Sequence, residues 1–203
     1  MMRSAAMIAL GATLLVPAAA NAASGDPDWP CQQIKVPELS LAAVWSGPPV
    51  DPQQSDWKDD QQVADLVQKL APRREPIDKA QALIHDFAQQ AGDRKQPLLL
   101  KLLAGVFSVL DAERDSVMAG LDRFGGRQKE LAAGIRADNE KLHALQTDQT
   151  ADPKAVQQMT QQVTWEVELF QDRRQAISYA CEAPSRIEQR LFALARQIQQ
   201  ELE

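Results

Sequence analysis

Apolar residues recur at steps of three and four along this chain from Val63 to Leu202, and this spacing constrains the fold more than any other feature. Because an α-helix turns once every 3.6 residues, such steps place apolar side chains along one face of a helix. Gln, Ala, Leu, Asp, Glu and Arg are abundant and aromatic residues are scarce, which is typical of helices with solvated outer faces. The sequence therefore predicts an all-α protein with negligible strand.

Prolines and glycines divide this pattern into helices. A first helix is expected to begin at Asp56, with Ser55 as its N-cap, and to end before a break at 71–75. Pro76 suits the first position of a second helix, and Gly92 is the expected C′ residue of that helix. The pattern thus predicts two short helices ahead of the longer ones.

Two long helices follow. One opens near Asp93, and the other begins after a turn that ends with its N-cap, Asp152, and has Pro153 at its first position. Pro184 should kink or end this last helix, beyond which the apolar face continues. Alternating apolar steps of three and four along these helices form a seven-residue repeat, which favours coiled-coil-like packing between antiparallel neighbours. We therefore expect an elongated antiparallel helical hairpin or bundle over residues 55–203, with the two long helices as its spine.

The pair Gly125-Gly126 interrupts the first of these long helices. Each glycine inside a helix costs about 1 kcal/mol relative to alanine, so the pair predicts a kink, a hinge or a short break. A break would form a tip that presents backbone groups and Phe124 to a partner. Phe124, Gly125 and Gly126 are therefore one candidate binding site, and the alternative is that they serve only intramolecular packing.

The first 22 residues have the features of a signal peptide. Arg3 supplies the positive n-region, an apolar run extends over 5–16, and a small-residue A-x-A cleavage site ends at Ala22. The apolar run is too short for a stable membrane-spanning helix, although an uncleaved N-terminal anchor is the alternative. We therefore expect an exported protein, periplasmic in a Gram-negative source, with no membrane span after removal of the signal.

An extended segment rich in proline and tryptophan, residues 23–54 (the N-terminal segment), precedes the predicted helices. It contains Cys31, and the other cysteine of the chain is Cys181 in the last helix. Two cysteines in an exported chain predict one disulfide, which for a loop of this length contributes roughly 4–5 kcal/mol through chain entropy. We expect this disulfide to pin the segment across the bundle. A redox-active or intermolecular thiol is the alternative, although the chain has no C-x-x-C motif.

The N-terminal segment also holds a second candidate binding site. Trp45 and the bend Gly47-Pro48-Pro49 lie there, and aromatic residues are favoured anchors in protein interfaces. The prolines lower the entropy cost of fixing an otherwise floppy segment. Alternatively, Trp29 and Trp45 fill a groove of the bundle itself, because burial of a large aromatic side chain already stabilises a fold.

The chain offers no catalytic constellation. It contains no G-x-S-x-G, H-E-x-x-H, Walker or C-x-x-C-H motif. Glu140 and His143 share one helix face, as in di-iron carboxylate bundles, but a second such pair is missing. The segment 111–122 resembles an EF-hand loop, yet Ser116 occupies the position that requires glycine. The sequence therefore predicts no catalytic, cofactor or metal site.

The net charge of −6 argues against binding to nucleic acid or to an anionic membrane. Export, long helices and the absence of a catalytic motif favour a non-enzymatic protein. We expect it to bind other envelope or secreted proteins as a scaffold, adaptor or chaperone, and a homo-oligomer is compatible with the same features. The alternatives are a metal- or cofactor-binding helical bundle and an enzyme whose site leaves no motif.

Overall fold

The computed structural model describes Asp26 and residues 28–203, and the predicted signal peptide lies outside this part of the chain. The described residues form helices and contain no strand, which confirms the all-α prediction. None of these helices combines the length and the apolar character that crossing a membrane requires. In chain order they are the 3₁₀-helix η1 (Leu41–Ala43), α1 (Gln61–Leu70), α2 (Ile77–Gln90), the 3₁₀-helix η2 (Gly92–Arg94), α3 (Lys95–Thr147), α4 (Pro153–Ala180) and α5 (Ala183–Leu202).

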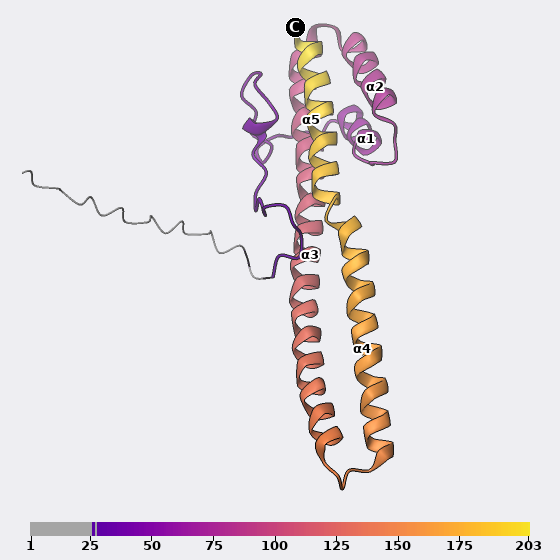
Figure 1. The fold of residues 1–203 in the computed structure, drawn as a ribbon. Helices are drawn as coiled ribbons and strands as arrows, with labels where there is room; N and C mark the ends of the chain where they lie inside the picture. Colours follow the sequence, from indigo (N-terminus) through magenta and orange to yellow (C-terminus); the bar gives the residue numbers. More distant parts are fainter. Residues whose placement is uncertain (1–25, 27) are drawn as a thin grey trace, which may run out of the picture.

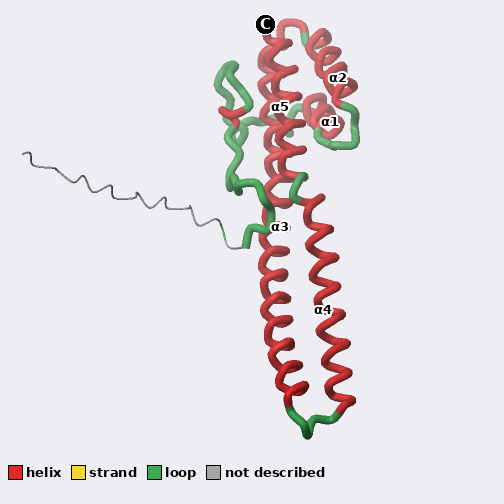
Figure 2. The backbone as a smooth tube through the Cα atoms, in the orientation of Figure 1, coloured by secondary structure: helices red, strands yellow, loops and turns green. Residues whose placement is uncertain are grey.

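Helix α3 is the spine of an elongated molecule (Figure 1). Its first half packs against α1, α2 and α5, which together form a head. Its second half packs against the antiparallel α4, and these two helices form an arm, residues 126–180, that projects from the head (Figure 2). At 1.5 Å per residue, α4 alone spans about 42 Å. The predicted antiparallel hairpin with the long helices as its spine is therefore confirmed.

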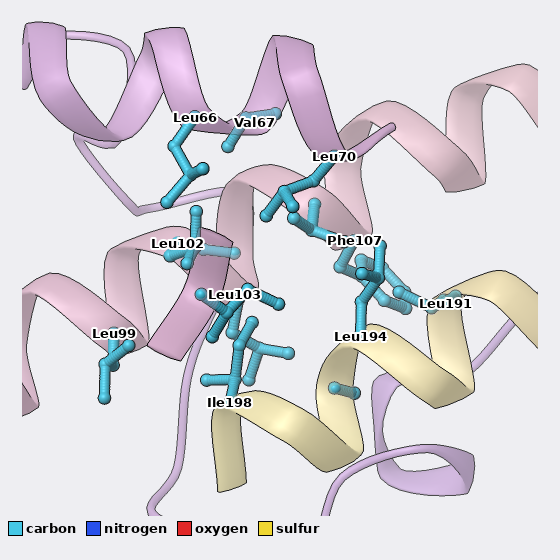
Figure 3. Close-up of a cluster of buried hydrophobic side chains, with 14 of the residues drawn as sticks. Leu66, Val67, Leu70, Leu99, Leu102, Leu103, Phe107, Leu191, Leu194 and Ile198 are labelled. Carbon is cyan, nitrogen blue, oxygen red and sulfur yellow. The ribbon is translucent and has the colours of Figure 1, made fainter. Parts of the chain in front are cut away.

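The hydrophobic core lies in the head, where leucines of α3 meet the apolar faces of α1 and α5 (Figure 3). Each aliphatic side chain of this size contributes about 1.5–3 kcal/mol when it is fully buried. No buried member of the core lies between Leu110 and Ile187, so the arm takes no share in it. The largest fully buried apolar residues are Val63, Leu70, Ile84, Leu99, Leu102, Leu103, Leu110, Ile187, Leu191, Leu194 and Ile198.

Local signals set two of the helix ends as predicted. The carboxylate of Asp152 accepts a hydrogen bond from the backbone N–H of Lys154 at 3.0 Å, so Asp152 caps α4. Gly92 follows α2 with a φ of 54°, a left-handed conformation that glycine adopts without steric cost. These ends depend on atoms within one turn of the boundary, which is why the sequence reveals them.

The predicted start of the first helix is wrong. The expected N-cap Ser55 and the helix start at Asp56 lie in a turn, and α1 begins five residues later, after Asp60. The Asp60 carboxylate accepts a hydrogen bond from the backbone N–H of Val63 at 3.3 Å and so caps the helix. The turn instead places the Trp57 ring in the core, where it is 6% exposed.

The glycine pair 125–126 does not break α3, which runs continuously through both residues. A Cβ at Gly125 would lie 1.7 Å from the backbone oxygen of Asp28, because the N-terminal segment crosses the helix at this point. A Cβ at Gly126 would meet nothing within 4 Å. The predicted break and tip are therefore wrong. Gly125 is the position that allows two backbones to approach each other.

The disulfide Cys31–Cys181 joins the N-terminal segment to the end of α4, across a sequence separation of 150 residues. The predicted pairing is thus confirmed. Close to it, the Lys35 ammonium pairs with Asp122 at 2.8 Å and with Asp26 at 2.5 Å. The hydrogen bonds that Lys35 donates to these two carboxylates raise its pKa above the ordinary value. The segment is therefore held by a covalent bond and by charge.

A buried arginine of α3 fixes the same segment to the helices. Arg114 is 1% exposed, and its Nε donates to the Glu188 carboxylate of α5 at 2.6 Å. Its Nη2 donates to the carbonyl of Val36 at 2.7 Å, and its Nη1 faces the carbonyl of Pro37 at 3.5 Å. The guanidinium fork presents five donors in one plane, so a single side chain connects three segments.

Candidate protein-binding surface

The second candidate binding site begins with Trp45, and the structure places this residue inside the head. The Trp45 ring is 8% exposed and belongs to the hydrophobic core. Its indole Nε1 donates to the carbonyl of Pro48 at 2.8 Å, and a Cβ at Gly47 would lie 2.4 Å from the ring. The bend therefore folds over its own tryptophan. Of these four residues only Pro49 is exposed, so the Trp45 ring contributes to packing and not to the surface.

Phe124 and Gly125 line a groove at the base of the arm, where the N-terminal segment crosses α3. The groove has a volume of about 260 Å³ and its walls are mostly apolar. Trp29 enters it from the N-terminal segment and Phe170 from α4, whereas Gly126 does not line it. The structure thus brings two of the three predicted residues together with aromatic side chains from two other parts of the chain.

One polar group in this groove lacks a partner. The Gln128 side chain donates its Nε2 to the carbonyl of Phe170 at 2.8 Å. Its Oε1 is enclosed, and no residue that the structure describes donates a hydrogen bond to it. A buried acceptor without a donor costs about 1–3 kcal/mol. Because the oxygen is enclosed, this cost falls within the wall of the groove, and the atom is not open to a bound group.

The rim of the groove is charged. The Lys129 ammonium pairs with the Asp28 carboxylate at 2.8 Å, and both side chains are about half exposed. Arg174 also lines the groove and is exposed. Over the described residues, no carboxylate lies within ion-pair distance of Arg174. The groove therefore combines apolar walls with one cation available to a bound group.

The arm itself buries little of its apolar seam. Val163 is the one buried residue of α4, and on the arm's part of α3 only Asp138 is buried. The remaining apolar residues that face between the helices are half-buried: Leu131, Ile135, Leu142, Leu145, Val156, Met159, Val167, Phe170 and Ile177. Two helices alone cover only part of such a seam, so its edges are open to a further helix or segment.

A polar contact fixes the register of the two arm helices. The Asp138 carboxylate of α3 accepts hydrogen bonds from the Gln162 side chain of α4 and from Lys141, each at 2.7 Å. The bond to Asp138 raises the pKa of Lys141 above its ordinary value. The hydrogen bond from Gln162 joins the two helices at a buried carboxylate. Sliding one helix along the other would break this bond, so the contact fixes their alignment.

Two large side chains of α4 are exposed on the arm. Trp165 is 60% exposed and Tyr179 is 73% exposed. Neither residue is among the binding residues predicted from the sequence. Trp165 lies two residues after Val163, and two residues on a helix turn the side chain to the opposite face. This offset from the apolar stripe is the sequence signal that identifies Trp165 as a surface residue.

The remaining sequence candidates for chemistry are the pair Glu140 and His143 and the two cysteines. Glu140 and His143 are both exposed on the arm. Within the described chain, no group of three or more His, Cys, Asp or Glu side chains is arranged to hold a metal ion. Both cysteines are joined in the disulfide. The other surface features of the described chain are the groove, the half-buried seam of the arm and the exposed aromatic residues.

Comparisons of this chain with protein-family models, with curated proteins and with solved structures find no match. No function is therefore carried over from a relative. The function must be inferred from the surface and charges of this chain alone.

Proposed function

We propose that this protein is a non-enzymatic, exported binding protein, and that its arm holds another envelope or secreted protein as a scaffold, adaptor or chaperone. The observation that carries the proposal is Trp165, which is 60% exposed on a helix that buries only Val163. Tryptophan is enriched among the residues that contribute most to protein interfaces. An exposed tryptophan on a narrow, projecting helix pair is therefore best explained by a partner.

The division of the molecule into head and arm supports the same proposal. All buried core residues lie in the head and in the segments packed on it, so the arm is not required for the core. A projecting helix pair of this length, with a half-buried seam, offers a long contact surface and contributes little to the stability of its own chain. Helix-in-groove and helix-on-helix recognition use such half-covered apolar faces.

The groove at the base of the arm supplies a second contact region. Its apolar walls would take an apolar side chain of the partner. The Arg174 guanidinium at the rim would attract an acidic residue of the partner. We infer that the preferred partner segment carries an apolar residue close to an acidic one.

A site-specific photo-crosslinking experiment tests this function. A photoreactive phenylalanine analogue replaces Trp165 in the arm, and in a matched control it replaces Phe192, which is 48% exposed on α5 of the head. After irradiation in the native compartment, we expect a discrete heavier adduct from position 165 and none from position 192.

Two outcomes would contradict the proposal. Equal adduct patterns from both positions would show that exposure alone causes the crosslinks. An adduct of twice the chain mass from position 165 would assign the arm to self-association instead.

The variant Trp165→Ala should keep its free energy of unfolding within about 0.5 kcal/mol of the wild type, because the side chain is exposed. Loss of the partner in this variant would then reflect binding and not unfolding.

A further inference from the structure

A second cavity lies between the α1–α2 connection and α5, and arginine side chains line it. Its volume is about 380 Å³, and it is lined by Arg73, Ile77, Arg186, Gln189, Arg190 and Ala193. Three of these six residues are cationic and none is acidic, in a chain whose net charge is −6. Such a concentration of guanidinium groups around one hollow attracts an anion.

Arg190 is the most unusual member of this set. It is 8% exposed, and its Nε and Nη1 donate to the carbonyls of Leu70 at 2.7 Å and of Glu75 at 2.8 Å. These bonds satisfy the end of α1 and the connection that follows. The Nη2 is enclosed and has no hydrogen-bond partner among the residues that the structure describes. Burial lowers the pKa of this guanidinium, and the nearby carboxylates of Glu75 and Glu113 oppose that shift.

The two outer arginines are held in place by carboxylates behind them. The Nε of Arg73 pairs with Glu113 at 3.0 Å, and the Nη2 of Arg186 pairs with Glu182 at 2.5 Å. Each of these pairs occupies one nitrogen of a fork that has five N–H donors, so further donors remain on both side chains. Glu113 and Glu182 do not line the cavity. They orient the arginines and leave the cavity open to a ligand.

We propose that this cavity binds an oxyanion, a carboxylate or a phosphate, that carries a small apolar group. The oxyanion would accept hydrogen bonds from the forks of Arg73 and Arg186, and the charge of Arg190 in the cavity wall would add to the attraction. The apolar group would cover Ile77, which is 38% exposed, and the neighbouring Ala193. A volume of about 380 Å³ lies within the range of small-molecule sites. This site is independent of the protein-binding function proposed for the arm.

Isothermal titration calorimetry of the mature chain tests the site. The probes are inorganic phosphate, acetate and hexanoate, each at one ionic strength that is balanced with chloride. We expect saturable binding of hexanoate and of at least one of the two smaller oxyanions, phosphate and acetate. Hexanoate should bind at least threefold tighter than acetate. The double variant Arg73→Gln/Arg186→Gln should bind at least tenfold more weakly. Arg190 is left unchanged in this variant because it also caps α1.

The matched control is Arg196→Gln on the same helix. Arg196 packs over the Phe192 ring at 5.8 Å and does not line this cavity, so its loss should change the affinity less than twofold. Circular dichroism melting checks that both variants fold, and the single variant Arg186→Gln, whose side chain is 66% exposed, replaces the double variant if that one unfolds. A direct readout is the side-chain NMR signal of Arg190, which should shift with the oxyanions but not with chloride.

Three results would overturn the proposal. The first is an absence of saturable heat with all three probes. The second is an equal loss of affinity in Arg196→Gln and in the double variant, which would indicate an effect of net charge alone. The third is hexanoate binding no tighter than acetate, which would contradict the proposed contact between an apolar group of the ligand and the cavity.

Discussion

The adjacent residues Gly125 and Gly126 provide a sharp test of how the N-terminal segment packs on α3. Alanine at either position removes the helix penalty of glycine, which stabilises α3 by up to about 1 kcal/mol. At Gly126 nothing lies within 4 Å of the new Cβ, so this gain should be retained. At Gly125 the new Cβ would lie 1.7 Å from the backbone oxygen of Asp28. The same substitution should therefore have opposite effects at neighbouring positions.

The magnitude of the loss at Gly125 follows from this contact. A carbon and a carbonyl oxygen approach each other to roughly 3.3 Å, so the backbone near Asp28 would have to move by about 1.6 Å. The Cys31–Cys181 disulfide lies three residues further along and limits that movement. Overpacking of a well-packed contact costs about 1–3 kcal/mol. After subtraction of the helix gain, Gly125→Ala should lower the free energy of unfolding by up to about 2 kcal/mol, while Gly126→Ala raises it by about 0.5–1 kcal/mol.

Urea unfolding followed by circular dichroism at 222 nm measures both variants. A difference of about 2 kcal/mol corresponds to a separation of about 4–8 °C in Tm for a chain of this size. Limited proteolysis supplies a second readout, because a displaced N-terminal segment should be cleaved faster in Gly125→Ala than in Gly126→Ala. If the two variants prove equally stable and equally resistant to protease, the close crossing at Gly125 is refuted.

Three further predictions concern stability. Replacement of Cys31 and Cys181 by serine should lower the free energy of unfolding by up to about 4–5 kcal/mol, as urea unfolding would show, because the unfolded chain gains freedom. Arg114→Met should cost about 3 kcal/mol in the same assay, since two backbone carbonyls and the Glu188 carboxylate lose a buried donor. Burial, with Asp115 nearby, raises the pKa of Asp111 above its ordinary value, an effect that Glu38 increases and Arg114 opposes. Because the folded state therefore disfavours the ionised carboxylate, Asp111→Asn should raise stability at pH 7, and the gain should vanish once the pH falls below the unfolded value of 3.8.

Each of these predictions has its own control. Two reactive thiols in the unfolded, unreduced wild type would contradict the disulfide. Arg123→Met, at an exposed position of α3, should change stability by less than about 0.5 kcal/mol, and a loss as large as that of Arg114→Met would contradict the role of the buried fork. For Asp111→Asn, a gain that is the same at pH 3 and pH 7 would show that ionisation is not its cause.

Features that depend on neighbours along the chain can be predicted from the amino-acid sequence. The helical faces follow from the three-to-four spacing, and the start of α4 and the end of α2 follow from Asp152 and Gly92. The disulfide partners were also readable, because the chain has two cysteines. The start of α1 escaped prediction although it too is local, since Ser55 and Asp60 both suit an N-cap and only one of them is used.

Which surfaces are covered depends on contacts between segments that are distant in the chain. Trp45 and Trp165 are the same residue type, yet the first is 8% exposed and the second 60%, because the bend 47–49 folds over one ring and nothing covers the other. In the same way, glycine at position 125 looks like a helix breaker until the backbone of residue 28 is seen to cross it. The physical reason is range: helix periodicity and caps act within a turn or two, whereas burial depends on segments that lie about a hundred residues away in the chain.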